Sequence, residues 1–263
     1  MTLSADLAAA PLLSFAALDS PNAETRRRAG AGGGGPLWIT AAEQTAGRGR
    51  RGRAWSTRPG NLAATLLLTT DRSPSDVVRI AFVAALAVAD LADAFVPPAL
   101  VSVKWPNDVL VDGRKLSGSL IESGRMADRR LWLALGVGLN LAHAPTDVER
   151  PATALADHLR VEVAAPPNPK AALSILAQAL ARRTAQWEAD GFDAVVQAWS
   201  ERAANLGRRC VAALPNESVE GVAEALEPDG ALRLRLDDGS IRRITAGDVF
   251  LSHDASAPMS EVG

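Results

Sequence analysis

Cysteine and histidine are scarce in this sequence, which limits the metal sites and cross-links that it can form. Its 263 residues include one cysteine, Cys210, and three histidines, His143, His158 and His253, which lie far apart in the chain. One cysteine excludes an intramolecular disulfide and a cysteine-based metal cluster, and the histidines show no metal-ligand spacing. We therefore expect no metal centre built from these residue types.

Long apolar runs and a strong net charge are also missing. The longest apolar run, residues 80–89, is too short to cross a bilayer, which needs about 20 residues, and no signal-peptide pattern opens the chain. Lysine and arginine number 28 against 30 acidic residues, whereas proteins that coat nucleic acid are usually basic overall. We therefore expect a cytoplasmic protein that does not associate with membranes, with ordinary globular composition and a substantial core.

The apolar patterning predicts an α+β fold with a mixed sheet. Helices and strands alternate irregularly and hairpin signals recur, which argues against a doubly wound parallel sheet. Asp112-Gly113 is one such signal, because a tight turn there requires positive φ angles. The expected helices are residues 1–18, 22–29, 76–95 (capped by Ser75 or Asp76), 170–189 and 192–205, and the expected strands are 37–42, 61–70, 100–104, 109–111, 116–122 and 131–141.

The pattern of apolar segments and turn residues changes near Gly207. From residue 208 to 251, short apolar segments alternate with turn signals such as Pro228-Asp229-Gly230, which is the rhythm of a small β-barrel of about five strands. We expect one domain over residues 1–207, a small C-terminal barrel over 208–253, and a frayed tail over 254–263.

Positive charge is concentrated in residues 47–53, GRGRRGR, which we call the arginine loop. Its arginines repel one another and its glycines fix no conformation, so a polyanion such as a phosphorylated ligand would order it. At an effective dielectric constant near 20, one ion pair at 4 Å contributes roughly 4 kcal/mol, and Trp55 could stack on a base. A solvated surface loop and a nucleic-acid-binding arm are alternative interpretations of the same charges.

Three further motifs carry polar groups where strands end or begin. In the segment KWPND, residues 104–108, Asp108 could bind Mg²⁺ through its carboxylate, although Pro-Asn-Asp is also an ordinary turn. Lys115 follows the Asp112-Gly113 turn and could be a fixed ammonium or an ordinary exposed lysine. In GVGLN, residues 136–140, the glycines allow close approach of a ligand or mark a bulge, and Asn140 could bind an adenine edge.

The order and spacing of these motifs resemble those of the biotin protein ligases. Along the chain come Asp19-Ser20-x-Asn22, Gln44, GRGRRGR with Trp55, KWPND, RKLSG and GVGLN, followed by the small β-domain. The similarity extends from about residue 14 to about residue 252, and GRGRRGR combined with KWPND is highly specific to the family. The resemblance implies a mixed sheet flanked by helices and followed by an SH3-like domain, which agrees with the patterning.

The resemblance also implies an ATP-dependent reaction in two steps. The carboxylate of biotin attacks the α-phosphate of ATP, which gives biotinyl-5'-AMP and pyrophosphate. A lysine of a biotin carboxyl carrier domain then displaces AMP. Biotin and ATP are therefore the expected substrates, Mg²⁺ the expected cofactor, and the carrier domains of acyl-CoA carboxylases the expected protein partners. We expect a monomer or a homodimer.

Roles for individual residues follow from the same resemblance. Lys115, Arg48 and Arg50 would be catalytic, because joining two anions requires cations. Asp108 would help to hold Mg²⁺. The residues expected to contact biotin are Ser20, Pro21, Asn22, Gln44, Arg48, Gly49, Arg50 and Lys115. The residues expected to contact ATP or the adenylate are Arg50, Arg51, Arg53, Trp55, Lys104, Asn107 and Asn140.

Two departures from the family pattern matter. The family usually has Ser-Thr-Asn where this chain has Ser20-Pro21-Asn22, so any hydrogen bond from the middle position is lost. Some members carry an N-terminal helix-turn-helix domain, but 18 residues before Asp19 are too few for one. We therefore expect the type of ligase without that domain and expect no DNA binding.

Two other functions remain possible from the residues alone. A lipoate ligase or octanoyltransferase would have a similar fold, but octanoyltransferases use a cysteine nucleophile, and Cys210 lies on a predicted strand where a buried structural thiol is the favoured interpretation. A noncatalytic nucleic-acid binder would explain the arginine loop. It would give no reason for Lys115, Asp108 and Asn140.

Overall fold

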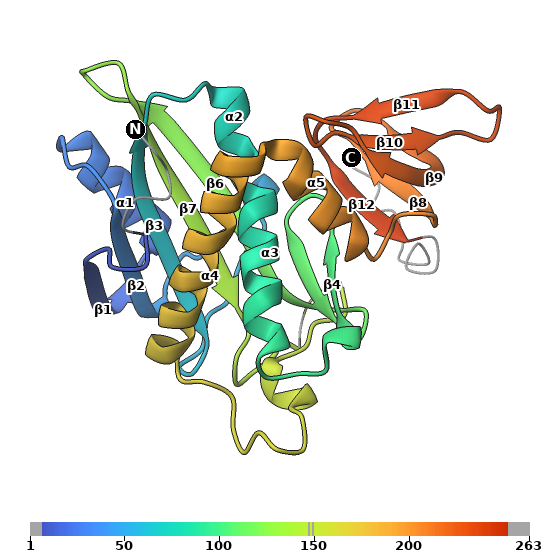
Figure 1. Cartoon of the computed structure of the whole chain (residues 1–263). Coiled ribbons are helices and arrows are strands. Elements are labelled where there is room, and N and C mark those ends of the chain that lie inside the picture. The colour runs from blue at the N-terminus through green and yellow to red at the C-terminus, as the bar shows by residue number, and fades with distance from the viewer. Residues whose placement is uncertain (1–6, 147, 149, 252–263) are drawn as a thin grey trace, which may run out of the picture.

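Seven strands form one mixed sheet in the order β1-β2-β3-β7-β6-β5-β4 (Figure 1). The computed structural model describes residues 7–146, 148 and 150–251. β1 and β2 pair in parallel, and the other neighbours pair antiparallel. The predicted fold class, α+β with a mixed sheet, is confirmed. The strands are β1 Leu12–Leu18, β2 Leu37–Gln44, β3 Leu62–Thr70, β4 Val101–Lys104, β5 Asp108–Val111, β6 Arg114–Arg125 and β7 Leu131–Leu139.

The helix predicted over residues 1–18 is wrong for the described part of that range. Residues 12–18 form β1, the edge strand, with Leu12 opposite Trp38 and Leu18 opposite Gln44. The Ala/Leu composition favours a helix locally, but pairing with β2 satisfies the backbone and overrides that weak preference. Residues 1–6 lie outside the described residues, as does the tail expected over 254–263.

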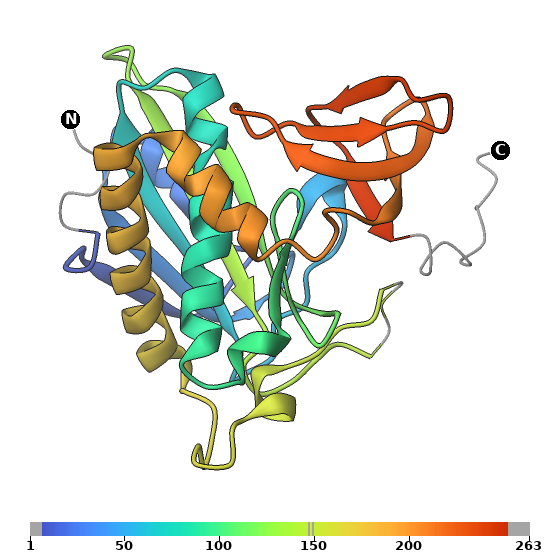
Figure 2. The ribbon, with the colours of Figure 1, turned by 45° about the vertical axis from the view of Figure 1, so that its right-hand side comes forward.

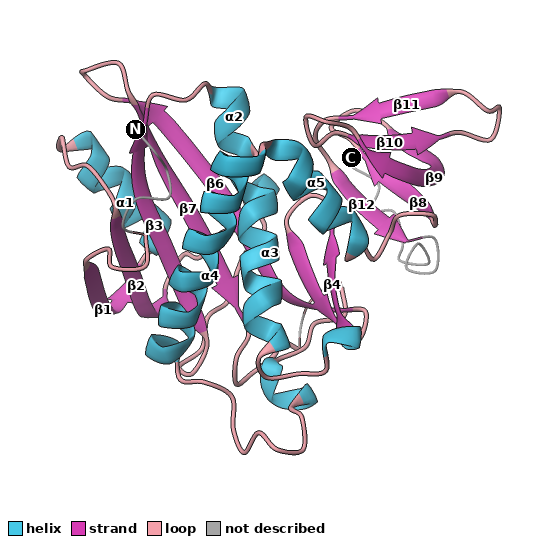
Figure 3. Ribbon diagram, in the orientation of Figure 1, coloured by secondary structure: helices cyan, strands magenta, loops and turns pink. Residues whose placement is uncertain are grey.

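Helices cover both faces of this sheet (Figures 2 and 3). Strand periodicity divides β3 between the faces: Leu66 and Leu68 join the main apolar core, whereas Thr65 points the other way and donates a hydrogen bond to Asn22 of α1. The helices are α1 Pro21–Gly30, α2 Pro74–Val78, α3 Ile80–Asp93, α4 Pro169–Asp190 and α5 Phe192–Glu201, with short 3₁₀ turns at η1 Arg50–Gly52, η2 Pro98–Leu100 and η3 Leu155–His158.

The helix predicted over residues 76–95 is divided in two. α2 begins at Pro74 after Ser73, whose hydroxyl accepts a hydrogen bond from the backbone N–H of Asp76, so Ser73 is the cap rather than Ser75 or Asp76. α3 follows, and nearly all of it is buried, because it lies between the sheet and the helices α4 and α5. Described residues include no helix both long and apolar enough to cross a membrane.

A second, antiparallel sheet lies beside the β4 end of the first and has the strand order β11-β10-β9-β8-β12 (Figure 1). Trp105 anchors it, because this buried side chain donates a hydrogen bond from Nε1 to the carbonyl oxygen of Gly230, at 3.0 Å. Five short strands were predicted here, and five are present. Within the described residues no pairing joins the two end strands, so hydrogen bonds do not close a barrel. The strands are β8 Arg209–Ala213, β9 Ser218–Leu226, β10 Leu232–Arg235, β11 Ile241–Ile244 and β12 Asp248–Leu251.

Candidate active site

A cavity of about 560 Å³ opens on the sheet face that carries α1. This volume suits a small-molecule ligand. Arg51 and Lys104, both predicted to contact ATP, are not among its lining residues. The predicted residues that line it are Ser20, Pro21, Asn22, Gln44, Arg48, Gly49, Arg50, Arg53, Trp55, Asn107, Asp108, Lys115 and Asn140.

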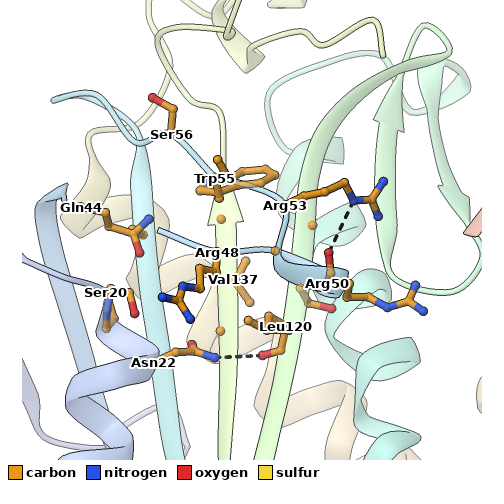
Figure 4. A pocket seen from close by; sticks show the side chains of 18 of the residues that line it. Ser20, Asn22, Gln44, Arg48, Arg50, Arg53, Trp55, Ser56, Leu120 and Val137 are labelled. Atoms are coloured by element: carbon orange, nitrogen blue, oxygen red, sulfur yellow. Dashed lines mark hydrogen bonds between the residues drawn. The ribbon is translucent and has the colours of Figure 1, made fainter. Parts of the chain in front are cut away.

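The first turn of α1 forms one end of the cavity (Figure 4). Ser20 caps the helix, since its hydroxyl accepts a hydrogen bond from the N–H of Ala23, and Pro21 occupies the first helical position, where a missing N–H costs nothing. Asn22 is buried and fully oriented. Its amide donates to Oε2 of Glu122 at 2.8 Å, and its Oδ1 accepts from the hydroxyl of Thr65 at 2.6 Å.

The arginine loop folds as a narrow hairpin that also lines the cavity. Arg48 and Ala54 form an isolated antiparallel β-bridge. The N–H of Gly49 donates to the carbonyl of Arg53, and the N–H of Trp55 donates to the carbonyl of Gly47. A Cβ on Gly47 would lie 2.3 Å from the carbonyl oxygen of Trp55, so the hairpin requires glycine at that position. Figure 4 shows Arg48 directed toward Asn22, with Arg50 and Arg53 directed away from it.

The two glycines of GVGLN accommodate side chains of the protein itself. A Cβ on Gly136 would lie 2.1 Å from Oδ1 of Asn22, and a Cβ on Gly138 would lie 2.3 Å from the indole ring of Trp55. From the sequence, these glycines were expected either to allow close approach of a ligand or to mark a bulge. The register of β7 runs without a break through both positions, so neither glycine marks a bulge. They let Asn22 and Trp55 lie flat against β7.

Lys115 and Asp108 form an ion pair in the wall of the cavity. Nζ of Lys115 lies 2.6 Å from Oδ1 of Asp108 and 5.7 Å from the ring of Trp55. Strand pairing brings them together, since Asp108 begins β5 and β6 runs antiparallel to it. Among the described residues, no three side chains of the His, Cys, Asp and Glu types gather as a metal site would require.

Three arginines of the loop reach across to the second sheet. Arg53 donates to Oδ1 of Asp248 at 2.9 Å, and Arg51 lies 3.4 Å from Oδ2 of the same carboxylate. Arg50 donates to Asn107 Oδ1 at 3.2 Å and to the carbonyl of Gly247 at 2.9 Å, and burial lowers the pKa of its guanidinium. Asp248 was not predicted from the sequence, because nothing in its local sequence marks it and 195 positions separate it from Arg53.

Lys104 faces the second sheet rather than the cavity. Its Nζ lies 5.9 Å from the ring of Phe250 on β12, and the guanidinium of Arg150 lies 4.1 Å from the same ring. Phe250 is two positions beyond Asp248, so the strand period of two brings both side chains to the same face of β12. Arg150 lines the cavity and was also missed by the sequence analysis.

Asn140 directly follows β7 at the wall of the cavity and is buried. Its side-chain amide donates to the carbonyl of Thr153 at 3.1 Å. The turn that follows is held by Asn61, whose Oδ1 accepts from the backbone N–H groups of residues 141, 142 and 143. Asn61 therefore has a structural role that the sequence analysis did not identify.

Comparison with known proteins bears on the identity of this site. Residues 22–140 match the biotin/lipoate A/B protein ligase family, and residues 206–252 match the biotin protein ligase C-terminal domain. The chain is 39% identical over 238 residues to a biotin–[acetyl-CoA-carboxylase] ligase of Paracoccus denitrificans, which covers 90% of this chain and 98% of that protein. The chain belongs to the biotin protein ligase family. The family predicted from the motifs is thereby confirmed.

Further relatives agree with this membership of the biotin protein ligase family. A biotin–[acetyl-CoA-carboxylase] ligase of Mycobacterium tuberculosis is 34% identical over 239 residues, which cover 88% of this chain and 85% of that protein. The fold is also similar to that of a biotin protein ligase from Aquifex aeolicus solved in complex with biotin and ATP. That match has a TM-score of 0.73 and 23% identity, and it covers 92% of this chain and 98% of the other.

The environment of Cys210 separates this biotin protein ligase from enzymes that use a cysteine nucleophile. Cys210 is fully buried on β8, and burial raises the pKa of its thiol to about 11. A nucleophilic cysteine requires a lowered pKa and access to substrate. The interpretation of Cys210 as a buried structural thiol is confirmed.

Proposed function

We propose that this protein activates biotin with ATP and transfers it to a lysine of a biotin carboxyl carrier domain. The observation that carries the proposal is that one cavity is lined by the motif residues of α1, β2, the arginine loop, β5, β6 and β7, in a chain 39% identical to a biotin–[acetyl-CoA-carboxylase] ligase. Ser20, Asn22 and Gln44 bring hydrogen-bonding groups to this cavity, and Arg48, Arg50, Arg53 and Lys115 bring cations, which suits a ligand with a neutral ring and an anionic tail.

The α1 end of the cavity would bind the ureido ring of biotin. Ser20, Asn22 and Gln44 carry the polar groups there, and Gln44 is oriented because its Nε2 donates to the hydroxyl of Thr57 at 2.8 Å. Pro21 contributes apolar contact but has neither an N–H nor a polar side chain to donate to the ring. The carboxylate of biotin would then point toward Arg48, Gly49 and Lys115.

The arginine and Lys115 end would bind ATP and carry the first step. A carboxylate oxygen of biotin bonds to the α-phosphorus, the bond to the bridging oxygen breaks, and pyrophosphate leaves. Arg48, Arg50 and Lys115 offset the repulsion between the two anions and stabilise the charge that develops on the α-phosphate. Trp55 and Asn140 would contact adenine, and Asn107 and Arg53 would lie toward the phosphates. Arg51, which does not line the cavity, would contribute only positive charge beside it.

Lys104 is the predicted ATP contact that the geometry supports least. It is buried against the second sheet and does not line the cavity. We assign it to the contact between the KWPND segment and Phe250 of the second sheet.

Magnesium fits this site as an ion carried by the phosphates of ATP. Mg²⁺ is usually held by one or two carboxylates together with substrate phosphates. Asp108 is the candidate carboxylate, although its Oδ1 is already paired with Lys115. When bound, the ion would neutralise phosphate charge.

The second step requires an amine of the carrier domain. Its nitrogen attacks the acyl carbon of biotinyl-5'-AMP, an amide bond forms, the bond to the phosphate oxygen breaks, and AMP leaves as the amine loses a proton. The cavity is partly open to solvent, so an acceptor lysine could reach the acyl carbon from outside.

Transfer of labelled biotin tests this function directly. Purified protein, biotin and magnesium ATP are incubated with a carrier domain, and the intact mass of the domain is measured. We expect one biotinyl group on wild-type carrier and none on a carrier whose acceptor lysine is replaced by arginine. Lipoate is supplied in a parallel reaction. Addition of lipoyl without biotinyl would contradict the proposal and favour a lipoate ligase.

A further inference from the structure

The arginine loop converges on a carboxylate of the second sheet. Asp248 accepts a hydrogen bond from Arg53 at 2.9 Å and forms ion pairs with Arg51 and Arg50 at 3.4 and 3.7 Å. Its side chain is 8% exposed, whereas those of the three arginines are 23–42% exposed. A shielded anion therefore faces three partly exposed cations, an arrangement stronger than an isolated surface pair.

Backbone groups of the same sheet strengthen this contact. Arg50 donates to the carbonyl of Gly247 at 2.9 Å, and Arg51 donates to the carbonyl of Ala213 at 3.4 Å. Ala213 and Asp248 are directly opposite one another in the pairing of β8 with β12. The loop therefore lies against one edge of the sheet, through acceptors that strand pairing holds in fixed positions.

β12 fixes Asp248 in this position. Val249 is buried in the core of the second sheet, so its neighbours Asp248 and Phe250 project from the opposite face, toward the first sheet. Burial raises the pKa of Asp248, but Arg53, Arg50 and Arg150 lower it by more, so the carboxylate is charged.

The charges explain why the loop needs such a partner. The guanidiniums of Arg50, Arg51 and Arg53 repel one another, and Arg51 adopts φ 56°, ψ 27°, a left-handed conformation that is unfavourable for a residue with a side chain. One carboxylate cannot neutralise three guanidiniums, so the group keeps an excess of positive charge. That excess remains available to a polyanion in the adjoining cavity.

We propose that Asp248 is a positioning residue that holds the arginine loop folded beside the cavity that the loop lines. It supplies from within the chain the counter-charge that the loop requires, so that Arg50 and Arg53 are in place before a polyanion binds. Its effect on ATP use rests on the proposed function, whereas its effect on the loop does not. The second sheet thereby gains a role in the reaction.

Trypsin tests this proposal, because it cleaves after arginine and the loop contains four. Protein without nucleotide is digested briefly, and cleavage within residues 47–53 is identified by mass spectrometry. We expect Asp248→Asn to be cleaved in the loop at least about tenfold faster than wild type, since a charge-assisted hydrogen bond corresponds to a factor of about ten to a hundred. Asp248→Glu keeps the charge and should be cleaved more slowly than Asp248→Asn.

Asp237→Asn is the matched control. It removes the same charge from the same sheet, where Asp237 pairs with Arg209 away from the loop. Its loop should be cleaved at the wild-type rate. If Asp248→Asn does not fold, Arg53→Gln removes the shortest of the three contacts from the loop side, and cleavage after Arg48 and Arg50 gives the same comparison. Equal cleavage of the Asp248 or Arg53 variant and wild type would overturn the proposal.

Rescue by an anion separates a charge effect from general loosening. Sodium pyrophosphate should slow loop cleavage of Asp248→Asn back toward the wild-type rate, and sodium chloride of equal ionic strength should not. In the biotin-transfer assay, Asp248→Asn should raise the KM for ATP by about tenfold, with a smaller change in kcat. Faster cleavage without pyrophosphate rescue, or an unchanged or lower KM for ATP, would overturn the proposal. Absence of all biotin transfer by wild type would refute the proposed function, and the digestion without nucleotide would still test Asp248.

Discussion

Two glycines of β7 provide a paired test of the two ends of the cavity. Replacing Gly136 by alanine places a methyl group 2.1 Å from Oδ1 of Asn22, and replacing Gly138 places one 2.3 Å from the ring of Trp55. Both distances are far below van der Waals contact, so one partner must move. β7 is paired on both sides, so its backbone is held firmly and the facing side chain is displaced.

The expected magnitudes follow from what each displacement breaks. Overpacking costs about 1–3 kcal/mol, which for a chain of this size lowers Tm by roughly 2–10 °C. Gly136→Ala also removes the hydrogen bonds from Asn22 to Glu122 and from Thr65 to Asn22. Loss of one or two hydrogen bonds to biotin would raise its Kd by about tenfold. Gly138→Ala displaces Trp55, and stacking on a base is worth about 1–3 kcal/mol, so the Kd for ATP should rise by about 5- to 150-fold.

Calorimetric titration with biotin and with ATP separates the two effects. Gly136→Ala should weaken biotin binding more than ATP binding, and Gly138→Ala should do the reverse. Gly30→Ala is the control, because a Cβ at this last residue of α1 meets no atom within 4 Å. If both variants weakened the same ligand, or neither weakened any, the assignment of Asn22 to biotin and Trp55 to adenine would be refuted.

Three further predictions concern chemistry, reactivity and acid stability. Lys115→Ala should lower the rate of adenylate formation, measured by pyrophosphate exchange, by about 10²–10³-fold. Its Kd for biotin should change much less, and equal losses would mean that Lys115 acts in binding alone. Cys210 should react with a disulfide reagent at least about 100-fold more slowly in the native protein than after unfolding, because a pKa raised from 9.0 to about 11 lowers the thiolate fraction by that factor before burial is counted. Fast native labelling would contradict this. A hydrogen bond from Arg27 lowers the pKa of Asp19 from 3.8 to about 2, so the carboxylate stabilises the fold above about pH 4 and loses that contribution as the pH falls toward 2. Denaturant titrations should therefore show wild type losing more stability than Asp19→Asn between about pH 4 and pH 2, and parallel losses would contradict the pairing.

The fold was predictable where local signals agreed with tertiary packing. Asp112-Gly113 forms the predicted tight turn with φ angles of 51° and 71°, and the helix expected over residues 22–29 is present as α1, which Ser20 caps. The N-terminal segment was predicted wrongly. Residues 12–18 carry a helical composition but pair with β2, and a single sequence does not reveal which edge of a sheet will recruit a strand.

The candidate site was predictable to the extent that it lies in contiguous motifs. GRGRRGR, KWPND and GVGLN each contribute to the cavity, and each could be identified from charge, turn and glycine content. The reason for the glycines was not visible, since it depends on Asn22 and Trp55 reaching β7 from distant parts of the chain. Sequence spacing identifies which groups carry the chemistry, and tertiary packing decides which neighbours hold them.

Asp248, the partner of the arginine loop, is likewise placed by tertiary packing, and its contact with the loop changes the interpretation of the loop's positive charge. Clustered arginines were expected to need an external anion. The ion pairs with Asp248 show that the chain provides part of the required negative charge itself. A loop stabilised wholly by its own carboxylates would have no positive charge left for phosphates, and a loop with none would have to be ordered by the ligand at a cost of about 1–2 kcal/mol per residue. One carboxylate against three guanidiniums lies between these limits. The ratio keeps the loop folded and leaves a net positive charge facing the cavity, so a second acid at this contact should weaken ATP binding just as loss of the first should.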